Sequence, residues 1–254
     1  MSSIRILNSD QSLEQKNELL VVFTRTPRFG KVKTRLIPPL SPELALELHQ
    51  AFLEDTLENV EHMQRLYVNK LLCLSEPLKQ QDVLNIPTTG WEIELQVAGT
   101  LGKRLEAIFL KGFNDGHQRV VVIGSDSPTL PNKIINEAFD QLTTTKTVIG
   151  PAEDGGYYLI GCNKFIPQLF QDIDWGTSKV LSQTLRVTES LQVETKILPT
   201  WYDIDCSNDL EKLRNDIKRL EGSKSEFIPH RSAAVLSNEN KKHTFKSDTK
   251  DSEA

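Results

Sequence analysis

Arg119-Val-Val-Val-Ile-Gly-Ser-Asp-Ser-Pro-Thr-Leu130 is the stretch that decides the predicted fold. Its apolar run, Val120–Ile123, has the length and composition of a strand that is buried on both faces. Gly124 ends the run, and Pro128 fixes a turn that presents Asp126 directly after the strand. Ligands of open α/β sheets bind outside the carboxyl ends of the strands. The stretch therefore predicts a central strand with an acidic side chain at the ligand-binding edge of a sheet.

Strand-like and helix-like segments alternate on both sides of this stretch, which predicts one α/β domain over residues 18–221. The other predicted strands are 19–24, 67–75, 91–97, 147–150, 157–161 and 193–198. The predicted helices are one that begins at 42 and others at 77–84, 101–113, 131–142, 178–189 and 207–220. Residues 1–17 are predicted to be a flexible leader and 222–254 a disordered tail, because both are polar and poor in aromatic residues.

Side-chain chemistry places the ends and inner faces of these helices. Ser41, Thr100 and Ser207 are the expected N-caps. The residues expected to face inward from the helix 101–113 are Leu101, Leu105, Ile108 and Phe109. Asp55 shares the apolar face of the helix that begins at 42, so we expect it to be a buried structural hydrogen bonder.

Composition excludes several classes of protein. The chain has 254 residues, with 30 Lys and Arg against 35 Asp and Glu, a formal net charge of −5. This balance argues against general nucleic-acid or anionic-membrane binding. Three widely spaced cysteines, Cys73, Cys162 and Cys206, indicate a reducing compartment rather than a disulfide framework. The first residues lack a signal-peptide pattern, and no apolar run reaches the roughly 20 residues that span a bilayer. We therefore expect a cytoplasmic protein.

A basic loop follows the first predicted strand. It spans residues 25–35 and carries five cations: Arg25, Arg28, Lys31, Lys33 and Arg35. Cations at this place in an α/β sheet can neutralise a diphosphate, since Arg makes forked contacts and Lys supplies a point charge. The spacing is not that of a Walker A loop. The alternative is a solvated basic surface loop without a ligand.

Carboxylates come directly after two predicted strands. Asp126 could bind Mg²⁺ or Mn²⁺, which prefer oxygen ligands and often keep one or two carboxylates plus substrate phosphates. Alternatively, Asp126 makes an ordinary Asx turn. Asp203 and Asp205 flank Ile204 at strand spacing, so both could point to one face and one could complete the metal site. The alternative for Asp205 is a contribution to the cap of the last helix.

Glycine-containing turns form the remaining candidate elements. Asp154 precedes Gly155 and Gly156 and could be a general base or bind an acceptor hydroxyl, although a simple hairpin turn explains the same residues. Tyr157 is a packing residue that could line the pocket. Gln96-x-x-Gly99 precedes a helix start, where backbone amides could meet a phosphate or a base. Trp175 could belong to an acceptor-side loop or anchor it.

Five motifs occur together in a fixed order. They are Phe-Thr-Arg-x-Pro-x-x-Gly-Lys-x-Lys-Thr-Arg-Leu at 23–36, Gln-x-x-Gly-x-Leu-Gly-x-Arg-Leu at 96–105, Ile-Gly-Ser-Asp-Ser-Pro at 123–128, Gly-Pro-Ala-Glu-Asp-Gly-Gly-Tyr-Tyr-Leu-Ile-Gly at 150–161 and Trp-Tyr-Asp-Ile-Asp at 201–205. With them, the chain resembles the radical-SAM/selenodomain-associated transferase 1 family, also described as arsenosugar-biosynthesis-type glycosyltransferases. The resemblance covers about residues 18–220.

The resemblance implies a GT-A fold, the architecture of nucleotide-diphospho-sugar transferases, with a mixed, mostly parallel sheet flanked by helices. It is related to the fold of nucleotidyltransferases. The residues implied to bind the nucleotide are Phe23, Arg25, Lys33 and Arg35. The implied metal position is Asp126, with Asp205 as the better partner and Asp203 second, and the implied acceptor side is 154–156. Ser125-Asp126-Ser127 offers one carboxylate where many glycosyltransferases of this fold have Asp-x-Asp.

Three hypotheses follow from the residues and the resemblance together. The first is a Mg²⁺- or Mn²⁺-dependent transferase that moves a sugar from a nucleotide-activated donor to a small-molecule acceptor, with Asp154 and Asp126 as catalytic residues. The second is a nucleotidyltransferase that joins an NTP to a phosphorylated acceptor and releases pyrophosphate. The third is a non-catalytic nucleotide-binding module. In the first two, Gln96 and Gly99 contact the nucleotide, and Gly155, Gly156, Tyr157 and Trp175 contact the acceptor.

Overall fold

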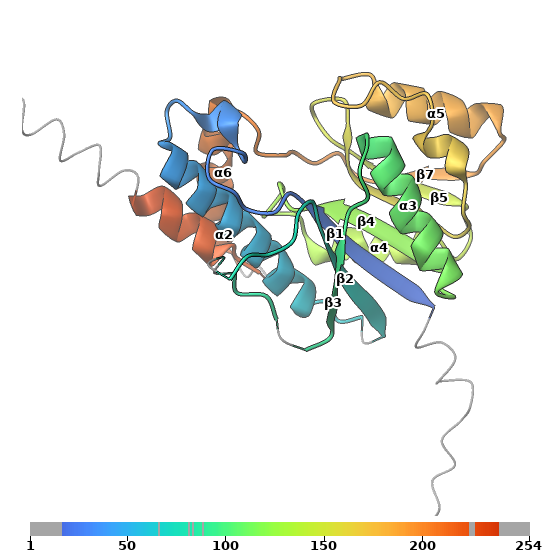
Figure 1. Ribbon diagram of the computed structural model, residues 1–254, viewed down its shortest axis with the longest axis horizontal. Coiled ribbons are helices and arrows are strands. Elements are labelled where there is room, and N and C mark those ends of the chain that lie inside the picture. Colours follow the sequence, from blue (N-terminus) through green and yellow to red (C-terminus); the bar gives the residue numbers. More distant parts are fainter. Residues whose placement is uncertain are drawn as a thin grey trace, which may run out of the picture.

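A seven-stranded sheet forms the centre of the computed structural model, which describes residues 17–65, 67–80, 82, 84–87, 89–223 and 227–238 (Figure 1). The strand order is β3-β2-β1-β4-β6-β5-β7. Only β6 runs antiparallel to its neighbours, so the sheet is mixed and mostly parallel, as predicted. The strands are β1 (Glu18–Thr24), β2 (Val68–Leu74), β3 (Trp91–Leu95), β4 (Arg119–Gly124), β5 (Thr147–Pro151), β6 (Tyr157–Cys162) and β7 (Thr195–Ile197).

Helices cover both faces of the sheet. They are α2 (Pro42–Glu61), α3 (Leu101–Asn114), α4 (Asn132–Gln141), α5 (Val180–Ser190) and α6 (Ser207–Glu221), with short 3₁₀ turns η1 (Thr34–Leu36) and η2 (Pro167–Phe170). One apolar core lies between the sheet and α2 with α4, and the second lies between the sheet and α3 with η2. A third cluster joins α2 to α6. Among the described residues, no helix has the length and apolar character needed to cross a membrane.

The period of two along β1 explains its central position. Leu20 and Val22 enter the core on the α2 side, whereas Leu19 and Val21 enter the core on the α3 side. Successive side chains of a strand point to opposite faces, so an uninterrupted apolar run suits a strand covered on both sides. The same pattern holds for Val120–Ile123 of β4, whose burial confirms the central strand predicted from the sequence.

The strand order reverses between β1 and β4, and this fixes the place of the site. β2 and β3 continue the sheet on one side of β1, whereas β4 pairs with β1 on the other side in parallel register. The hydroxyl groups of Thr24 and Ser125, at the carboxyl ends of β1 and β4, form a hydrogen bond of 2.7 Å. In open α/β sheets, the crevice at such a reversal point is where ligands bind.

The helix caps agree with prediction at two helices and differ at the last one. Ser41 Oγ accepts a hydrogen bond from the Leu44 amide at 3.2 Å, and Thr100 Oγ1 accepts one from the Lys103 amide at 3.3 Å. The N-cap of α6 is Cys206 rather than the predicted Ser207. The carboxylate of Asp209 accepts from the Cys206 amide at 2.7 Å and so satisfies the start of this helix.

Two other predictions about local structure are wrong. The described residues of the segment 77–84 form no helix; there the Asp82 carboxylate accepts from the Lys79 amide at 2.5 Å and from the Arg28 guanidinium at 2.6 Å. Such side-chain bonds to backbone compete with helical ones. Leu101 does not face the core: it is 41% exposed and lines the cavity described below.

A helical segment at 230–238 corrects the predicted disordered tail. Ser232 and Leu236 are buried against α2 and α6, and the expected buried hydrogen bonder Asp55 holds the segment in place. Its carboxylate accepts from the Ser232 amide at 2.8 Å and from the Ser232 hydroxyl at 2.5 Å. A short helix of this kind is stabilised by its tertiary contacts rather than by its own propensity. The predicted leader, apart from Asn17, and the tail beyond 238 lie outside the described residues.

Candidate active site

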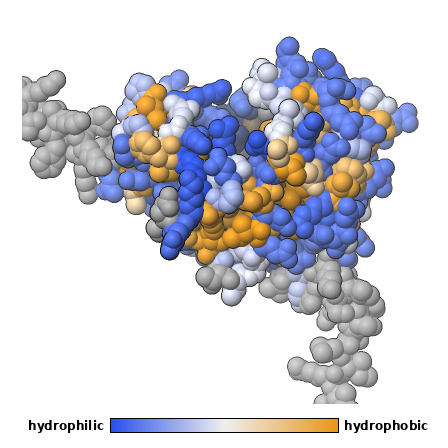
Figure 2. All heavy atoms as spheres, in the orientation of Figure 1, coloured by the Kyte–Doolittle hydropathy of each residue, from blue (hydrophilic) through white to orange (hydrophobic). Residues whose placement is uncertain are grey.

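A cavity of about 650 Å³ opens at the carboxyl ends of β1 and β4. Figure 2 shows the molecule hollowed between the side that carries α2 and α6 and the side that carries α3 and α5. In the described part of the chain, five cations and four carboxylates line this cavity: Arg25, Lys31, Lys33, Arg35, Arg104, Asp126, Asp154, Asp203 and Asp205. Charges of both signs are therefore concentrated at one concave site that the sheet topology creates.

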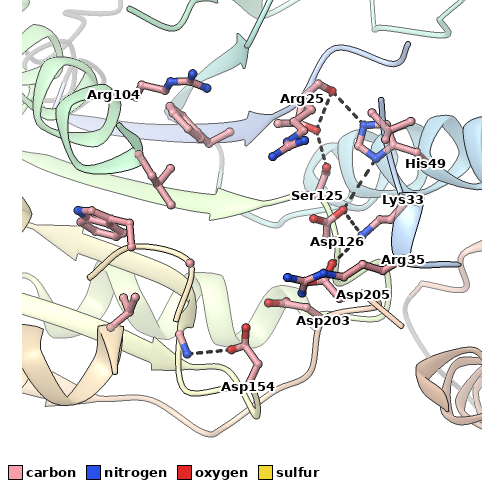
Figure 3. A pocket seen from close by; sticks show the side chains of 18 of the residues that line it. Arg25, Lys33, Arg35, His49, Arg104, Ser125, Asp126, Asp154, Asp203 and Asp205 are labelled. Atoms are coloured by element: carbon pink, nitrogen blue, oxygen red, sulfur yellow. Dashed lines mark hydrogen bonds and ion pairs between the residues drawn. The ribbon is translucent and has the colours of Figure 1, made fainter. Parts of the chain in front are cut away.

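Lys33 is a buried cation of the cavity. Its backbone is left-handed, with φ 48° and ψ 35°, at the residue that precedes η1. Its ammonium donates to the Ile204 carbonyl at 2.6 Å and lies 2.7 Å from Asp126 Oδ1 and 3.3 Å from Asp205 Oδ1 (Figure 3). Burial alone would lower the pKa of Lys33, but the two carboxylates raise it above its ordinary value. The side chain is only 4% exposed and keeps its charge.

Asp126 is placed by the turn after β4 and by a backbone contact with the segment after β7. The Ile204 amide donates to the Asp126 carbonyl at 2.9 Å, which brings the two segments to the same edge of the sheet. Burial would raise the pKa of Asp126, but Lys33 and then His49 lower it below its usual range. Asp126 therefore stays ionised, and its side chain is 41% exposed.

His49 lies in the wall of this cavity, and the sequence interpretation did not identify it. Its Nε2 is 2.9 Å from the Arg25 carbonyl, which can only accept, so Nε2 carries the proton. Burial is the main cause that lowers the pKa of His49, so the imidazole is neutral at pH 7. Its Nδ1 faces Asp126 Oδ1 at 3.9 Å. A polar residue on the inward face of α2, beside Leu48 and Phe52, was the available signal.

Asp203 and Asp205 both line the cavity while Ile204 between them is fully buried, in the alternating arrangement that their spacing predicts. Asp203 accepts a short hydrogen bond from the Ser127 hydroxyl. Burial, together with the negative charges of Asp126, Asp205 and Asp154, raises the pKa of Asp203 to about 6, although the Ser127 bond acts in the opposite direction. Asp205 is not the cap of α6, because its own amide donates to Asp209 at 2.9 Å.

The raised pKa of Asp203 predicts a stability gain when its charge is removed. The folded state binds a proton more tightly than the unfolded state, whose pKa is near 3.8, so folding stability falls as pH rises from about 4 to about 6 and stays reduced above. At roughly 1.4 kcal/mol per unit, Asp203→Asn should stabilise the metal-free protein by about 3 kcal/mol at pH 8 and about half as much at pH 5.

Urea unfolding of the wild type and Asp203→Asn in EDTA at these two pH values measures this difference. Ser127→Ala is the matched variant, because it removes the bond that opposes the shift and should increase the pH dependence of unfolding. Equal stability of wild type and Asp203→Asn at pH 8 would show that Asp203 carries no charge penalty.

The arrangement of Asp126 and Asp205 fits a divalent cation in part. Both carboxylates converge on one positive charge, the Lys33 ammonium, which stands where a metal ion would lie. No group of three or more His, Cys, Asp or Glu side chains in the described ranges is arranged to hold a metal ion. Mg²⁺ commonly takes one or two carboxylates and completes its shell with substrate phosphates and water. The site fits a cation that binds together with a phosphate ligand. Asp203 is a less suitable ligand for this cation, because its carboxylate already accepts a hydrogen bond from Ser127.

The basic loop divides between the cavity and the protein surface. Arg25, Lys31 and Arg35 line the cavity beside Lys33, and Phe23 lines it at the end of β1. Arg28 is excluded from the cavity lining, since its guanidinium pairs with Asp82 at 2.6 Å and donates to the Pro77 carbonyl at 2.6 Å. Four of the five loop cations therefore remain available to a ligand in this cavity.

Arg104 marks the opposite side of the cavity, on the first turn of α3. Its guanidinium donates to the Gly99 carbonyl at 3.0 Å and to Gln96 Oε1 at 3.2 Å. The Gln96 amide group in turn donates to the Thr24 carbonyl at 2.8 Å. Gln96 and Gly99 line the cavity, and these contacts show that they also position Arg104. Sequence reasoning did not name Arg104 as a site residue, although it is the Arg of the motif at 96–105.

The turn between β5 and β6 supplies the remaining wall. Asp154 Oδ1 accepts from the Gly156 amide at 2.8 Å, which is the turn geometry of the simple hairpin alternative, yet both residues line the cavity. Gly155 does not line it. Its φ is +89°, and a Cβ there would lie 2.3 Å from the Ser178 carbonyl oxygen, so this glycine is required by packing. Tyr157 and Trp175 line the cavity in edge-on contact, with ring centroids 6.1 Å apart.

Comparison with solved structures identifies the fold. A 4-diphosphocytidyl-2C-methyl-D-erythritol synthase from Anaerococcus prevotii DSM 20548 superposes with a TM-score of 0.52 at 11% identity, over 82% of this chain and 99% of the other. A CMP:2-keto-3-deoxy-manno-octonic acid synthetase complexed with CTP superposes with a TM-score of 0.50 at 10% identity, over 80% and 99%. These two likenesses, together with the strand order, show that the chain has a GT-A-like fold.

A more similar structure identifies the family. A "putative nucleotide-diphospho-sugar transferase from Desulfovibrio desulfuricans G20" has a TM-score of 0.75 and 31% identity, over 88% of this chain and 98% of the other. Residues 56–177 match the family described as "Uncharacterized protein conserved in bacteria (DUF2064)". The chain belongs to the family of the Desulfovibrio protein. No curated protein matches it.

Proposed function

We propose that this protein transfers a sugar from a nucleotide-diphosphate donor to a small-molecule acceptor. One observation carries the proposal: four cations of the loop after β1 and three carboxylates from β4 and the segment 203–205 line one cavity at the strand-order reversal. A ligand that complements both the cationic side chains and the carboxylates carries several negative charges and binds together with a metal cation. The description of the Desulfovibrio relative as a nucleotide-diphospho-sugar transferase supports this choice.

The cations of the cavity would hold the diphosphate. Arg25 and Arg35 can make forked contacts with phosphate oxygens, and Lys33 can supply a point charge. Preorganised positive charge stabilises the negative charge that develops on a departing phosphate. Phe23, Gln96 and Gly99 would contact the rest of the nucleotide, because they lie between the end of β1 and the start of α3.

Asp126 and Asp205 would hold a divalent cation, Mg²⁺ or Mn²⁺, with phosphate oxygens as further ligands. Such an ion supplies Lewis-acid charge at the phosphate that leaves. Asp203 would contribute less directly, through its charge and its bond with Ser127.

The acceptor would bind between the β5–β6 turn and Trp175. Asp154 uses one oxygen to fix the turn, and its other oxygen can accept the proton of an acceptor hydroxyl. Gly156, Tyr157 and Trp175 shape this wall, and Gly155 keeps the turn in place. An aromatic wall beside a carboxylate suits a neutral, hydroxylated ligand.

Titration calorimetry with UDP-, GDP- and other sugar nucleotides, each with and without Mn²⁺, tests the proposal. We expect at least one of them to bind and Mn²⁺ to strengthen that binding. Failure of every sugar nucleotide and every NTP to bind the purified protein would disprove a nucleotide-dependent activity. A matched variant is Arg28→Ala, which removes a cation of the same loop outside the cavity and should leave nucleotide affinity unchanged.

Nucleotidyl transfer is the second candidate, and the number of cations favours it. Five cationic side chains line the described cavity, which is enough charge for a triphosphate. Incubation with each NTP and with phosphorylated acceptors separates the reactions, since nucleotidyl transfer releases pyrophosphate and sugar transfer releases a nucleoside diphosphate. Nucleotide binding that survives Asp126→Asn, without turnover for any acceptor, would favour a non-catalytic binding module.

Two narrower statements belong to this proposal. The ordered motifs support membership of the radical-SAM/selenodomain-associated transferase 1 family. The three cysteines are unpaired, and Cys73 and Cys162 are buried, which supports a reducing, cytoplasmic location.

A further inference from the structure

The Lys33 ammonium lies where a divalent cation would bind. It is 2.7 Å from Asp126 Oδ1 and 3.3 Å from Asp205 Oδ1, and its side chain is 4% exposed. A Mg²⁺ ion would lie about 2.0–2.1 Å from carboxylate oxygens, within the space that this ammonium fills. Like charges so close together repel strongly in a partly buried site, so the ammonium and a metal ion exclude one another.

A second observation at the same point indicates that this position favours a cation. His49 Nδ1 and Asp126 Oδ1 are buried atoms that face each other at 3.9 Å; Nδ1 has no hydrogen-bond donor among the described residues, and Asp126 Oδ1 has the Lys33 ammonium at 2.7 Å. The proton of the imidazole is on Nε2, directed to the Arg25 carbonyl, so Nδ1 presents a lone pair toward a carboxylate oxygen. Two electron-rich atoms in this arrangement are stabilised by positive charge between or beside them.

The phosphate groups of a nucleotide would offer the Lys33 ammonium an alternative partner. It belongs to the loop that also brings Arg25 and Arg35 to the cavity, where phosphate groups of a nucleotide would lie. The lysine side chain has four flexible methylene groups and a compact charge, so it can exchange a carboxylate partner for a phosphate without a change of fold. Its present polar contacts are with two carboxylates and one carbonyl, and its ammonium also lies 5.5 Å from the centroid of the Phe52 ring.

We propose that Lys33 is an internal competitor for the divalent cation: its ammonium occupies the position between Asp126 and Asp205 in the free protein and moves to the phosphates when a nucleotide binds. The inference rests on the proposed function. Its consequence is an order of binding, because the metal position becomes free only as the nucleotide arrives. The device would keep the free enzyme from binding Mg²⁺ or Mn²⁺ unproductively.

Mn²⁺ binding to the nucleotide-free protein tests this exchange, with the free-ion signal in electron paramagnetic resonance as readout. We expect weak binding by the wild type and at least about tenfold tighter binding by Lys33→Met, which removes the competing charge. Adding Asp126→Asn to Lys33→Met should remove the gain. Arg28→Met is the control, since it deletes a cation of the same loop that lies outside the cavity and does not bridge the two carboxylates, and it should bind Mn²⁺ like the wild type.

Lys33→Gln repeats the measurement with a side chain that can still donate to the Ile204 carbonyl, so a folding defect of Lys33→Met does not decide the result. Equal Mn²⁺ affinity of wild type, Lys33→Met and Lys33→Gln would overturn the exchange. Nucleotide affinity is measured separately without metal. Loss of nucleotide binding in every protein would refute the proposed function, whereas the Mn²⁺ series alone decides whether Lys33 competes for the cation.

Discussion

Asp126→Asn should reduce donor turnover by about two to three orders of magnitude and abolish the effect of Mn²⁺ on nucleotide binding. The substitution keeps the shape of the side chain but removes the charge that pairs with Lys33 at 2.7 Å. Removal of one preorganised electrostatic contact from an active site typically costs a factor of this size. Asparagine is also a much weaker ligand for Mg²⁺ or Mn²⁺ than a carboxylate.

The nucleotide affinity of Asp126→Asn should change in opposite directions with and without metal. Asp126 contributes negative charge to a cavity that must receive phosphates, so Asp126→Asn should bind the nucleotide more tightly in EDTA and less tightly with Mn²⁺. Titration calorimetry under both conditions gives the two affinities. Asp154→Asn is the matched control, since Asp154 lines the same cavity on the acceptor side and should retain the Mn²⁺ effect on nucleotide binding.

Thermal unfolding tests whether a loss of activity in Asp126→Asn is caused by loss of the fold. Lys33 keeps its contacts with Asp205 and with the Ile204 carbonyl in Asp126→Asn, so the variant should remain folded. If Asp126→Asn turned over the donor at the wild-type rate, Asp126 would be an ordinary turn residue. The role of Asp126 would then be limited to its ion pair with Lys33.

The central strands could be predicted because their signals are local. An apolar run of four residues that ends in glycine requires no knowledge of distant residues to be recognised as a buried strand, and the same holds for Ser41 before Pro42 at the start of α2. The charged residues of the cavity wall could also be identified in the sequence. Lys33 lies in the basic loop after the first predicted strand, Asp126 follows the central strand, and Asp205 follows the last one.

The pairing of these side chains could not be predicted, because it depends on tertiary approach. Lys33 and Asp205 are 172 positions apart, and the bond between the Ile204 amide and the Asp126 carbonyl brings the segment that carries Asp205 to this edge of the sheet. The helix at 230–238 was missed for the same reason: it is held by the bond between buried Asp55 and Ser232, which are 177 positions apart. In the sequence, Arg28 resembles the other cations of its loop, but in the structure its ion pair with Asp82 holds it outside the cavity.

Gly102→Ala should disrupt the acceptor side of the cavity through a single methyl group. A Cβ at Gly102 would lie 2.4 Å from Trp175 Nε1 and 2.4 Å from the Phe170 carbonyl oxygen, so the Trp175 loop or η2 must move. Alanine improves helix propensity by up to about 1 kcal/mol, but overpacking of this kind typically costs about 1–3 kcal/mol. We expect a net loss of stability by urea unfolding and a raised KM for the acceptor, with a smaller change in donor affinity.

A double-mutant cycle with Trp175→Leu isolates the cause. The smaller side chain vacates the space beside Gly102, so Gly102→Ala should be less destabilising in the Trp175→Leu background than in the wild type, by about 1 kcal/mol or more. Lys103→Ala, an exposed position on the same helical turn, is the control and should change stability little. Additive effects of the two substitutions would mean that α3 does not hold Trp175. A coupled cycle would instead show that the helix that positions Arg104 also sets the aromatic wall of the acceptor side.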